Sequence, residues 1–356
     1  MRIQNFIISS LKIVSSQKHT SKLQQWLENI WYNNASGRFV LMPLSALYCA
    51  VNRYQRFKYR KPKAKLPCPV IVVGNITVGG TGKTPLTIHI VKLLQKAGYK
   101  PAIITRGYGG KASTWPQSVT PESDPQLVGD EAVLMATQTQ VPVYAGANRL
   151  QSIEQLTQAH DCDVIISDDG MQHYKLPRDI QIAVIDGERQ LGNGYCLPAG
   201  PLREKKERLA DCDLVVQNWG GVNSKPHTEQ YAMHLKGDVL INLFSKEEKP
   251  LSQFAKQKAH AITGIGNPQR FFSNLEKQGL ELITHSFPDH HDFIKADLDF
   301  SDSVDTIIMT EKDAVKCKAF ATENHWYLPV TAKLDDAFDQ RLLALLEQCT
   351  PPVLQG

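Results

Sequence analysis

The sequence lacks the features of an exported or membrane-spanning protein. Its seven cysteines stand singly with no CxxC pair, which argues against a disulfide framework or a zinc site and indicates a reducing cytosol. The longest apolar run, residues 39–51, has about 13 residues, short of the roughly 20 that a spanning helix needs. The opening stretch MRIQNFIISSLKIVSS is broken by serine and lysine and has no small-residue cleavage site, so we expect no signal peptide.

The chain also lacks a strong charge of one sign. Its 356 residues include 40 Lys and Arg against 36 Asp and Glu, a net charge of +4, so the overall balance does not indicate a nucleic-acid partner. Hydrophobic residues make up 42% of the chain, enough to bury the cores of the two or so domains that this length predicts.

Short β-rich apolar runs alternate with helical patterns over residues 63–222, which we expect to form one domain. The runs cover residues 70–73, 102–105, 141–144, 164–167, 180–185 and 214–216. Strands that alternate with helices predict right-handed crossovers and a mostly parallel sheet that is covered on both faces. The predicted fold class is α/β.

A smaller α/β domain is expected over residues 223–356, joined to the first by a hinge. Residues 220–226 are rich in glycine, asparagine, serine and proline, which is typical of a boundary. The elements predicted after it are strands at 260–263, 280–285, 306–309 and 326–330 and a closing helix at 337–349. A linker rich in proline and lysine, residues 61–69, ends the N-terminal helical segment 1–62.

The N-terminal segment combines an apolar helical face with a run of cations. The apolar side chains recur at helical spacing and the cations follow them: Val40, Leu44, Leu47, Tyr48, Val51 and Tyr54, then Arg53, Arg56, Lys58, Arg60, Lys61, Lys63 and Lys65. Such a helix suits docking on an anionic membrane surface. A helix packed on the core and followed by a solvated basic linker is the alternative, which these residues alone favour.

A glycine-rich turn, GNITVGGTGKT at residues 74–84, joins the first predicted strand to a helical pattern. This is the context of a P-loop, in which backbone N–H groups and a helix N-terminus bind phosphate oxygens, a lysine adds charge and a hydroxyl can bind Mg²⁺. The standard pattern has glycine in place of Thr77, but every phosphate-contacting position is present: Gly79, Gly80, Thr81, Gly82, Lys83 and Thr84. The sequence therefore predicts a nucleotide site.

Acidic residues that could hold the metal follow a predicted strand. Asp168 and Asp169 end the apolar run at 164–167, and the carboxyl end of a parallel strand is where bound Mg²⁺-nucleotide is expected. Asp130 and Glu131 open a helix after Gly129. Capping of that helix and catalysis explain this second pair equally well on local grounds.

Seven motifs, in this order, resemble those of one known family. They are GNITVGGTGKTP, TRGYGG, VGDE, SDDGMQH, LPAGPLRE, FPDHHD and TEKDAVK, between residues 74 and 316. Together they look like the tetraacyldisaccharide 4′-kinase family of lipid A biosynthesis. That family's own loop also lacks the first P-loop glycine, so Thr77 agrees with it. The resemblance covers nearly the whole chain.

The resemblance implies a lipid kinase with ATP and Mg²⁺ as cofactors. The expected reaction transfers the γ-phosphate of ATP to the 4′-hydroxyl of a tetraacylated glucosamine disaccharide 1-phosphate. The expected location is the cytoplasmic face of the inner membrane, as a peripheral or monotopic protein with no obligate protein partner. The N-terminal segment then becomes a docking element for a substrate whose acyl chains stay in the lipid.

Two other classes of function remain as alternatives. One is a membrane-associated P-loop ATPase or nucleotide switch that acts on a protein partner. The strand at 214–216 leads into Gln217-Asn218-Trp219 and not into a guanine-reading Asn-Lys-x-Asp motif, which argues against a GTPase switch. The other is a soluble sugar or nucleoside kinase, against which the N-terminal helix and its cations argue.

The resemblance also implies roles for individual residues. Asp130 matches the catalytic base and His290 the histidine that pairs with it, with His291 as the adjacent alternative. Lys83 and Thr84 take the phosphate and Mg²⁺ roles, and closure of the second domain assembles base and nucleotide. The candidate metal ligands are Asp169 as first choice, Asp168 and Glu131. The residues expected to line the site are Gln172, His173 and Glu204. Arg106 and Lys312 are candidate charge stabilisers.

Overall fold

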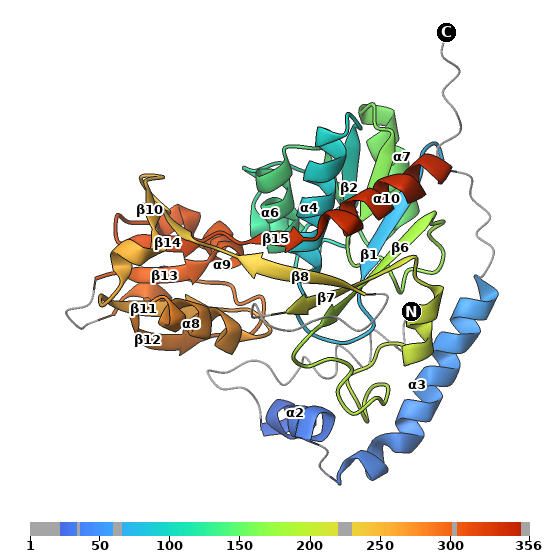
Figure 1. Ribbon diagram of the computed structural model, residues 1–356, viewed down its shortest axis with the longest axis horizontal. Coiled ribbons are helices and arrows are strands. Elements are labelled where there is room, and N and C mark those ends of the chain that lie inside the picture. The colour runs from blue at the N-terminus through green and yellow to red at the C-terminus, as the bar shows by residue number, and fades with distance from the viewer. Residues whose placement is uncertain (1–21, 34–35, 60–65, 220–229, 301–304, 350–356) are drawn as a thin grey trace.

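The apolar runs form the strands of two sheets in the computed structural model (Figure 1), which describes residues 22–33, 36–59, 66–219, 230–300 and 305–349. The larger sheet has nine strands in the order β15-β8-β7-β6-β1-β5-β2-β4-β3. Its strands are β1 (Val70–Gly74), β2 (Pro101–Thr105), β3 (Gln117–Val119), β4 (Val143–Ala145), β5 (Val164–Ser167), β6 (Ile180–Asp186), β7 (Leu214–Trp219), β8 (Tyr231–Lys236) and β15 (Thr331–Leu334). All pairings are parallel except those of the two edge strands, β3 and β15.

The smaller sheet has six strands in the order β10-β9-β14-β13-β11-β12. These are β9 (Val239–Asn242), β10 (Glu248–Pro250), β11 (Lys258–Thr263), β12 (Glu281–Ser286), β13 (Ile307–Thr310) and β14 (His325–Leu328). The helices α8 (Pro268–Lys277) and α9 (Glu311–Cys317) contribute to separate cores that contain strands of this sheet. The predicted α/β class is confirmed for both units.

Helices cover both faces of the larger sheet (Figure 1). One core contains α4 (Lys83–Lys96), α6 (Asp130–Thr139) and α10 (Asp336–Cys349), which pack on residues such as Ile71 and Val73 of β1. The opposite core contains α7 (Arg149–Ala159) and residues such as Val70 and Val72. Alternate residues of β1 therefore face opposite cores, as strand geometry requires. Each face buries its apolar surface under helices.

The assignment of everything after residue 223 to the smaller unit was wrong in one respect. Strands β8 and β15 pair with each other in the larger sheet, and α10 packs on that sheet through Phe338, Leu342 and Leu346. The predicted hinge at 220–226 lies outside the described residues, but the strands on either side of it, β7 and β8, are neighbours in the larger sheet. Apolar periodicity predicts that a strand or helix exists, but it does not say which sheet the element joins.

The chain passes between the sheets twice, just after β8 and just before β15. These two crossings lie side by side, since a Cβ on Gly237 would come within 2.6 Å of the carbonyl oxygen of Pro329. The smaller sheet is therefore inserted into the larger unit through two adjacent connections.

The position of α10 gives a stability prediction. Phe338 is fully buried between α10 and the larger sheet, so Phe338→Ala should lower the free energy of unfolding by about 3–5 kcal/mol. Chemical denaturation measures this change. The exposed residue Gln348 on the same helix provides the control, because Gln348→Ala should change the free energy by less than about 0.5 kcal/mol. Equal effects would show that α10 does not pack as described.

Two N-terminal helices, α2 (Lys22–Asn33) and α3 (Arg38–Lys58), pack beside the loops that follow β5 and β6. The buried side of α3 is largely polar: Ser45 Oγ donates a 2.7 Å hydrogen bond to Cys196 O, and Asn52 Nδ2 donates one of 2.7 Å to Arg203 O. Tyr48, which we predicted on the same apolar helical face as Val40 and Leu44, is buried, whereas those two side chains are exposed. Among the described helices, none is both long enough and apolar enough to cross a bilayer.

Candidate active site

The backbone of the glycine-rich loop between β1 and α4 explains its sequence. Gly79 and Gly82 have φ angles of 99° and 92°, in the left-handed region that disfavours other residues, and a Cβ on Gly82 would lie 2.5 Å from Asn218 Nδ2. Thr77 instead forms an isolated β-bridge with Leu202 and is buried. Position 77 therefore does not require glycine, which accounts for the departure from the standard P-loop pattern.

Charged side chains meet where α4 begins and β5 ends. Lys83 Nζ lies 3.5 Å from Asp169 Oδ1, and Arg203 Nη1 donates a hydrogen bond of 3.2 Å to the same oxygen. Asp168 is fully buried and accepts a hydrogen bond of 3.0 Å from Thr87 Oγ1. Thr84, next to Lys83 in the first turn of α4, is also buried. The structure thus brings the predicted lysine and both predicted acids together.

The two acids have different electrostatic surroundings. Burial raises the pKa of Asp168 to about 7, and the negative charge of Glu131 adds to this effect. Burial also acts to raise the pKa of Asp169, but the cations Lys83 and Arg203 outweigh it and hold the pKa of that carboxyl well below its usual range. Asp169 is therefore ionised at neutral pH, as a metal ligand must be, whereas Asp168 is easily protonated.

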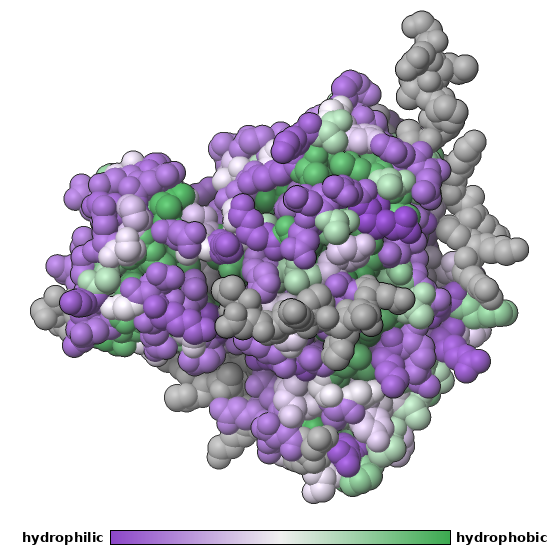
Figure 2. All heavy atoms as spheres, in the orientation of Figure 1, coloured by the Kyte–Doolittle hydropathy of each residue, from purple (hydrophilic) through white to green (hydrophobic). Residues whose placement is uncertain are grey.

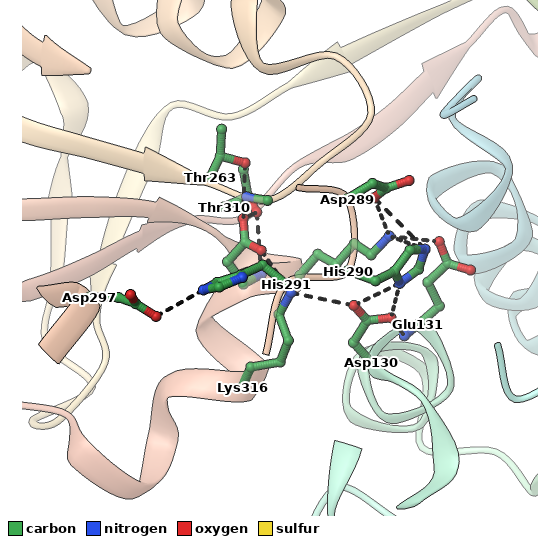
Figure 3. Close-up of polar contacts among 12 residues, drawn as sticks. Asp130, Glu131, Thr263, Asp289, His290, His291, Asp297, Thr310 and Lys316 are labelled. Atoms are coloured by element: carbon green, nitrogen blue, oxygen red, sulfur yellow. Dashed lines mark hydrogen bonds and ion pairs between the residues drawn. The ribbon is translucent and has the colours of Figure 1, made fainter. Parts of the chain in front are cut away.

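The predicted acid and histidine come from different units of the fold: the acid lies on a helix that packs on the larger sheet, and the histidine lies in a loop of the smaller sheet. Asp130 begins α6, at the positive end of the helix dipole, and is 4% exposed. His290 follows β12, and its Nδ1 lies 3.1 Å from both carboxylate oxygens of Asp130 (Figure 3). His291 pairs instead with Asp297, its Nε2 lying 2.8 Å from Oδ2. The histidine beside Asp130 is therefore His290 and not His291.

The contacts around His290 fix its tautomer. Lys312 Nζ, which can only donate, lies 3.3 Å from His290 Nε2, so His290 Nδ1 carries the hydrogen that is donated to Asp130. Lys312 Nζ also lies 3.0 Å from Glu131 Oε1. Burial acts to raise the pKa of Asp130, but the charge of Lys312 and the hydrogen bond from His290 outweigh it and hold that pKa below its usual range. Asp130 is therefore an ionised carboxylate at neutral pH.

The residues predicted to line the site lie close to these groups. Gln172 Nε2 donates hydrogen bonds of 3.0 Å to Glu204 Oε1 and 2.9 Å to the backbone oxygen of Asn75 in the phosphate loop. Burial lowers the pKa of His173 to about 4, so this side chain is neutral. The exposed Arg106 follows β2, and its charge acts on His173.

Cations that our sequence reasoning missed complete the site. Arg203 pairs with Asp169, and Lys316 Nζ lies 3.5 Å from Asp130 Oδ2. Both belong to quoted motifs, LPAGPLRE and TEKDAVK, whose charged positions were the available signal. The buried Arg149, whose Nη2 donates a 3.2 Å hydrogen bond to the backbone oxygen of Asp168, lies outside the motifs, and no sequence signal marks it.

The smaller sheet closes against the phosphate loop. A Cβ on Gly266, in the loop after β11, would lie 3.2 Å from Gly80 N and 3.6 Å from Asp289 Oδ2. Arg270 of α8 also reaches the larger sheet and pairs with Asp186 at the end of β6, with 3.0 Å between Nη2 and Oδ1. The loop after β12 therefore lies beside the phosphate loop, in a site built from both sheets.

Comparison with known proteins adds a solved structure of the same architecture. The crystal structure of the "apo" form of LpxK from Aquifex aeolicus in complex with ATP is 28% identical in sequence and superposes with a TM-score of 0.73. The match covers 87% of this chain and 99% of that one. The fold and the ATP of that complex agree with the nucleotide site described above.

Sequence comparison is more specific. A relative from Nitrosococcus oceani, named tetraacyldisaccharide 4′-kinase, is 46% identical and covers 89% of this chain and 93% of its own length. A relative of the same name from Methylobacillus flagellatus is also 46% identical, over 90% of this chain and 96% of its own length. A family model described as tetraacyldisaccharide-1-P 4′-kinase matches residues 37–347. The chain therefore belongs to the tetraacyldisaccharide 4′-kinase family.

Proposed function

We propose that the chain transfers the γ-phosphate of ATP to the 4′-hydroxyl of a tetraacylated glucosamine disaccharide 1-phosphate, giving the 1,4′-bisphosphate. The observation that carries this proposal is the pairing of Asp130 with His290 next to a P-loop, in one site closed by both sheets. A base beside a triphosphate cradle is the arrangement that transfer to a hydroxyl requires. The names of the relatives support the choice of acceptor.

Asp130 acts as the general base in this proposal. The 4′-hydroxyl gives its proton to the Asp130 carboxylate while its oxygen attacks the γ-phosphorus, the bond to the bridging oxygen breaks and ADP leaves. The Nδ1–H of His290 holds the carboxylate in one orientation. Lys83 and the backbone N–H groups of the loop stabilise the charge on the phosphate oxygens.

Thr84 and Asp169 would hold Mg²⁺, with Asp168 and Glu131 close by. No three His, Cys, Asp or Glu side chains cluster as a metal site within the described ranges. A Mg²⁺ ion bound with a nucleotide takes one or two carboxylates from the protein and its other ligands from phosphates and water. Asp168 Oδ2 is buried and has no hydrogen-bond partner among the described residues, so this oxygen is available to bind the ion or one of its water ligands. When bound, the ion would neutralise phosphate charge.

Removal of Mg²⁺ should abolish phosphate transfer, and its return should restore it. Because Asp169 is the ionised acid at the loop, Asp169→Asn should raise the Mg²⁺ concentration for half-maximal activity by at least about tenfold. A titration of activity against Mg²⁺ measures this, with Asp161→Asn as the control because Asp161 is exposed and pairs with Lys100. An unchanged titration for Asp169→Asn would remove this residue from the metal site.

The acceptor is tested by radiolabel transfer from γ-labelled ATP to a panel of lipid A precursors, soluble sugars and water. The proposal predicts label in the tetraacylated disaccharide alone. Release of labelled phosphate to water, with no labelled lipid, would favour the alternative of a membrane-associated ATPase. Label in a soluble sugar would favour a sugar kinase.

We also propose that α3 docks the enzyme on the cytoplasmic face of the inner membrane. Its outer side exposes large apolar side chains: Phe39, Val40, Met42, Leu44, Leu47, Tyr54 and Phe57. Figure 2 shows apolar side chains along the edge of the molecule where α3 lies. The exposed cations Arg53, Arg56 and Lys58 occupy the last turns of the helix. An exposed apolar face next to cations suits the surface of an anionic leaflet.

A further inference from the structure

We propose that Asp313 and Lys316, both in the TEKDAVK motif, are positioning residues that hold His290 and Asp130 together across the two sheets. The motif lies on α9, and neither residue has a part in the phosphate or metal roles described above. The inference rests on the proposed function of Asp130 as the general base. Figure 3 shows the side chains concerned, which come from α6, the loop after β12, the end of β11 and α9.

Asp313 ties α9 to the end of β11. It is fully buried, and its Oδ2 accepts hydrogen bonds from Thr263 Oγ1 at 2.9 Å, Gly264 N at 3.1 Å and Thr310 Oγ1 at 2.5 Å. A buried carboxylate with three donors on one oxygen is held firmly in one orientation. The turn at Gly264 is therefore fixed relative to α9.

The same turn fixes the backbone of His290. His290 N donates a 3.1 Å hydrogen bond to Gly264 O, and His290 has a φ of 61°, in the left-handed region that residues other than glycine enter at a cost. The hydrogen bond to Gly264 and the pairing of Nδ1 with Asp130 oppose relaxation to an ordinary conformation. The two hydrogen bonds therefore hold the imidazole toward Asp130 although the backbone of His290 is strained.

Lys316 joins this network to the larger sheet. Its side chain is 6% exposed, and its Nζ lies 3.0 Å from Asp313 Oδ1 and 3.5 Å from Asp130 Oδ2. The ammonium also lies over the ring of Phe293, 5.1 Å from its centroid. A buried ammonium that separates two buried carboxylates removes the repulsion that would otherwise push them apart.

These contacts close a ring. From Asp313 it runs through Gly264 to His290, across to Asp130 of the larger sheet, and back through Lys316. Each link is a hydrogen bond or an ion pair. Of the five residues, only Asp130 and His290 have a role in the proposed proton transfer. A ring of this kind restrains the distance between the base and its histidine, which a single contact cannot do.

Lys316→Met tests the inference, because methionine fills similar volume without the charge. Since a displacement of about 1 Å at a reacting group can cost on the order of 100-fold in rate, we expect kcat to fall by about 10- to 100-fold while the KM for ATP stays within about twofold. Lys316→Arg should recover most of the loss because it restores the cation. Lys277→Met, at an exposed lysine on α8, is the matched control and should leave both constants unchanged.

A double-mutant cycle separates positioning from a structural role. If Lys316 acts through the dyad, Lys316→Met should cost much less in a His290→Ala background than in the wild type. Equal losses in the two backgrounds, or a wild-type kcat for Lys316→Met, would overturn the inference. Lys316→Gln and Asp313→Asn enter the same cycle, so a failure of one variant to fold leaves the others to decide. Asp130→Asn separates failure of this inference from failure of the proposed function, because a wild-type kcat for Asp130→Asn would show that Asp130 is not the general base.

Discussion

Asp130→Ala should reduce the rate of phosphate transfer by about 10²- to 10⁴-fold and leave ATP binding nearly intact. The reason is geometric: Asp130 contacts His290 and Lys316, whereas the phosphate cradle is formed by the loop before α4. Loss of the carboxylate removes the proton acceptor and leaves the backbone donors of the cradle in place. Single-turnover transfer and ATP titration measure the two quantities separately.

Two controls make the result specific. Asp130→Asn keeps the shape of the side chain and its place at the start of α6 but cannot accept the proton, so its kcat should fall as far as that of the alanine variant. Asp161→Ala removes an exposed carboxylate remote from the loop and should change neither quantity. If ATP affinity and turnover fell by the same factor in the Asp130 variants, Asp130 would be a structural residue at the start of α6 and not a base.

The parts of the site that local sequence patterns predicted are those with a local cause, whereas the pairing of Asp130 with His290 was predicted from the resemblance to the family. A buried strand followed by glycines, Lys83 and Thr84 forms a P-loop because the backbone there folds within a few residues. Two acids after β5 were predictable for the same reason, since the carboxyl ends of parallel strands share one edge of the sheet. The strands predicted at 164–167 and 180–185 agree with β5 and β6 to within a residue.

The parts that the sequence did not predict depend on contacts between distant segments. The pairing of β15 with β8 joins residues about 100 positions apart, and no local pattern states which sheet an edge strand will join. Arg149, Asp313 and Lys316 are charged residues whose burial depends on contacts with other elements: the end of β5 for Arg149, the end of β11 for Asp313 and the start of α6 for Lys316. Within a single sequence Arg149 looks like any solvated charge, and the TEKDAVK motif marks Asp313 and Lys316 without naming the partners that bury them.

Substitution of the exposed face of α3 should release the enzyme from membranes without unfolding it. Val40, Leu44 and Leu47 are 79%, 54% and 61% exposed, so the triple change to serine removes no core contact and should leave the melting temperature unchanged. Burial of each such side chain in lipid contributes roughly 1.5–3 kcal/mol. Even partial insertion of three therefore predicts a loss of vesicle binding on the order of 100-fold. Sedimentation with anionic vesicles measures the loss.

Deletion of residues 1–60 is a poorer test, because Ser45 and Asn52 hydrogen-bond to the larger domain and their removal would expose its core. The matched control changes three other exposed apolar side chains, Leu127, Phe244 and Ile294, to serine. If general hydrophobicity caused binding, both triples would bind vesicles less. If α3 docks the enzyme, only its own triple loses binding and turnover of the long-chain acceptor, while turnover of a soluble short-chain acceptor is kept. Equal loss on both acceptors would place these residues in the active site and reject docking.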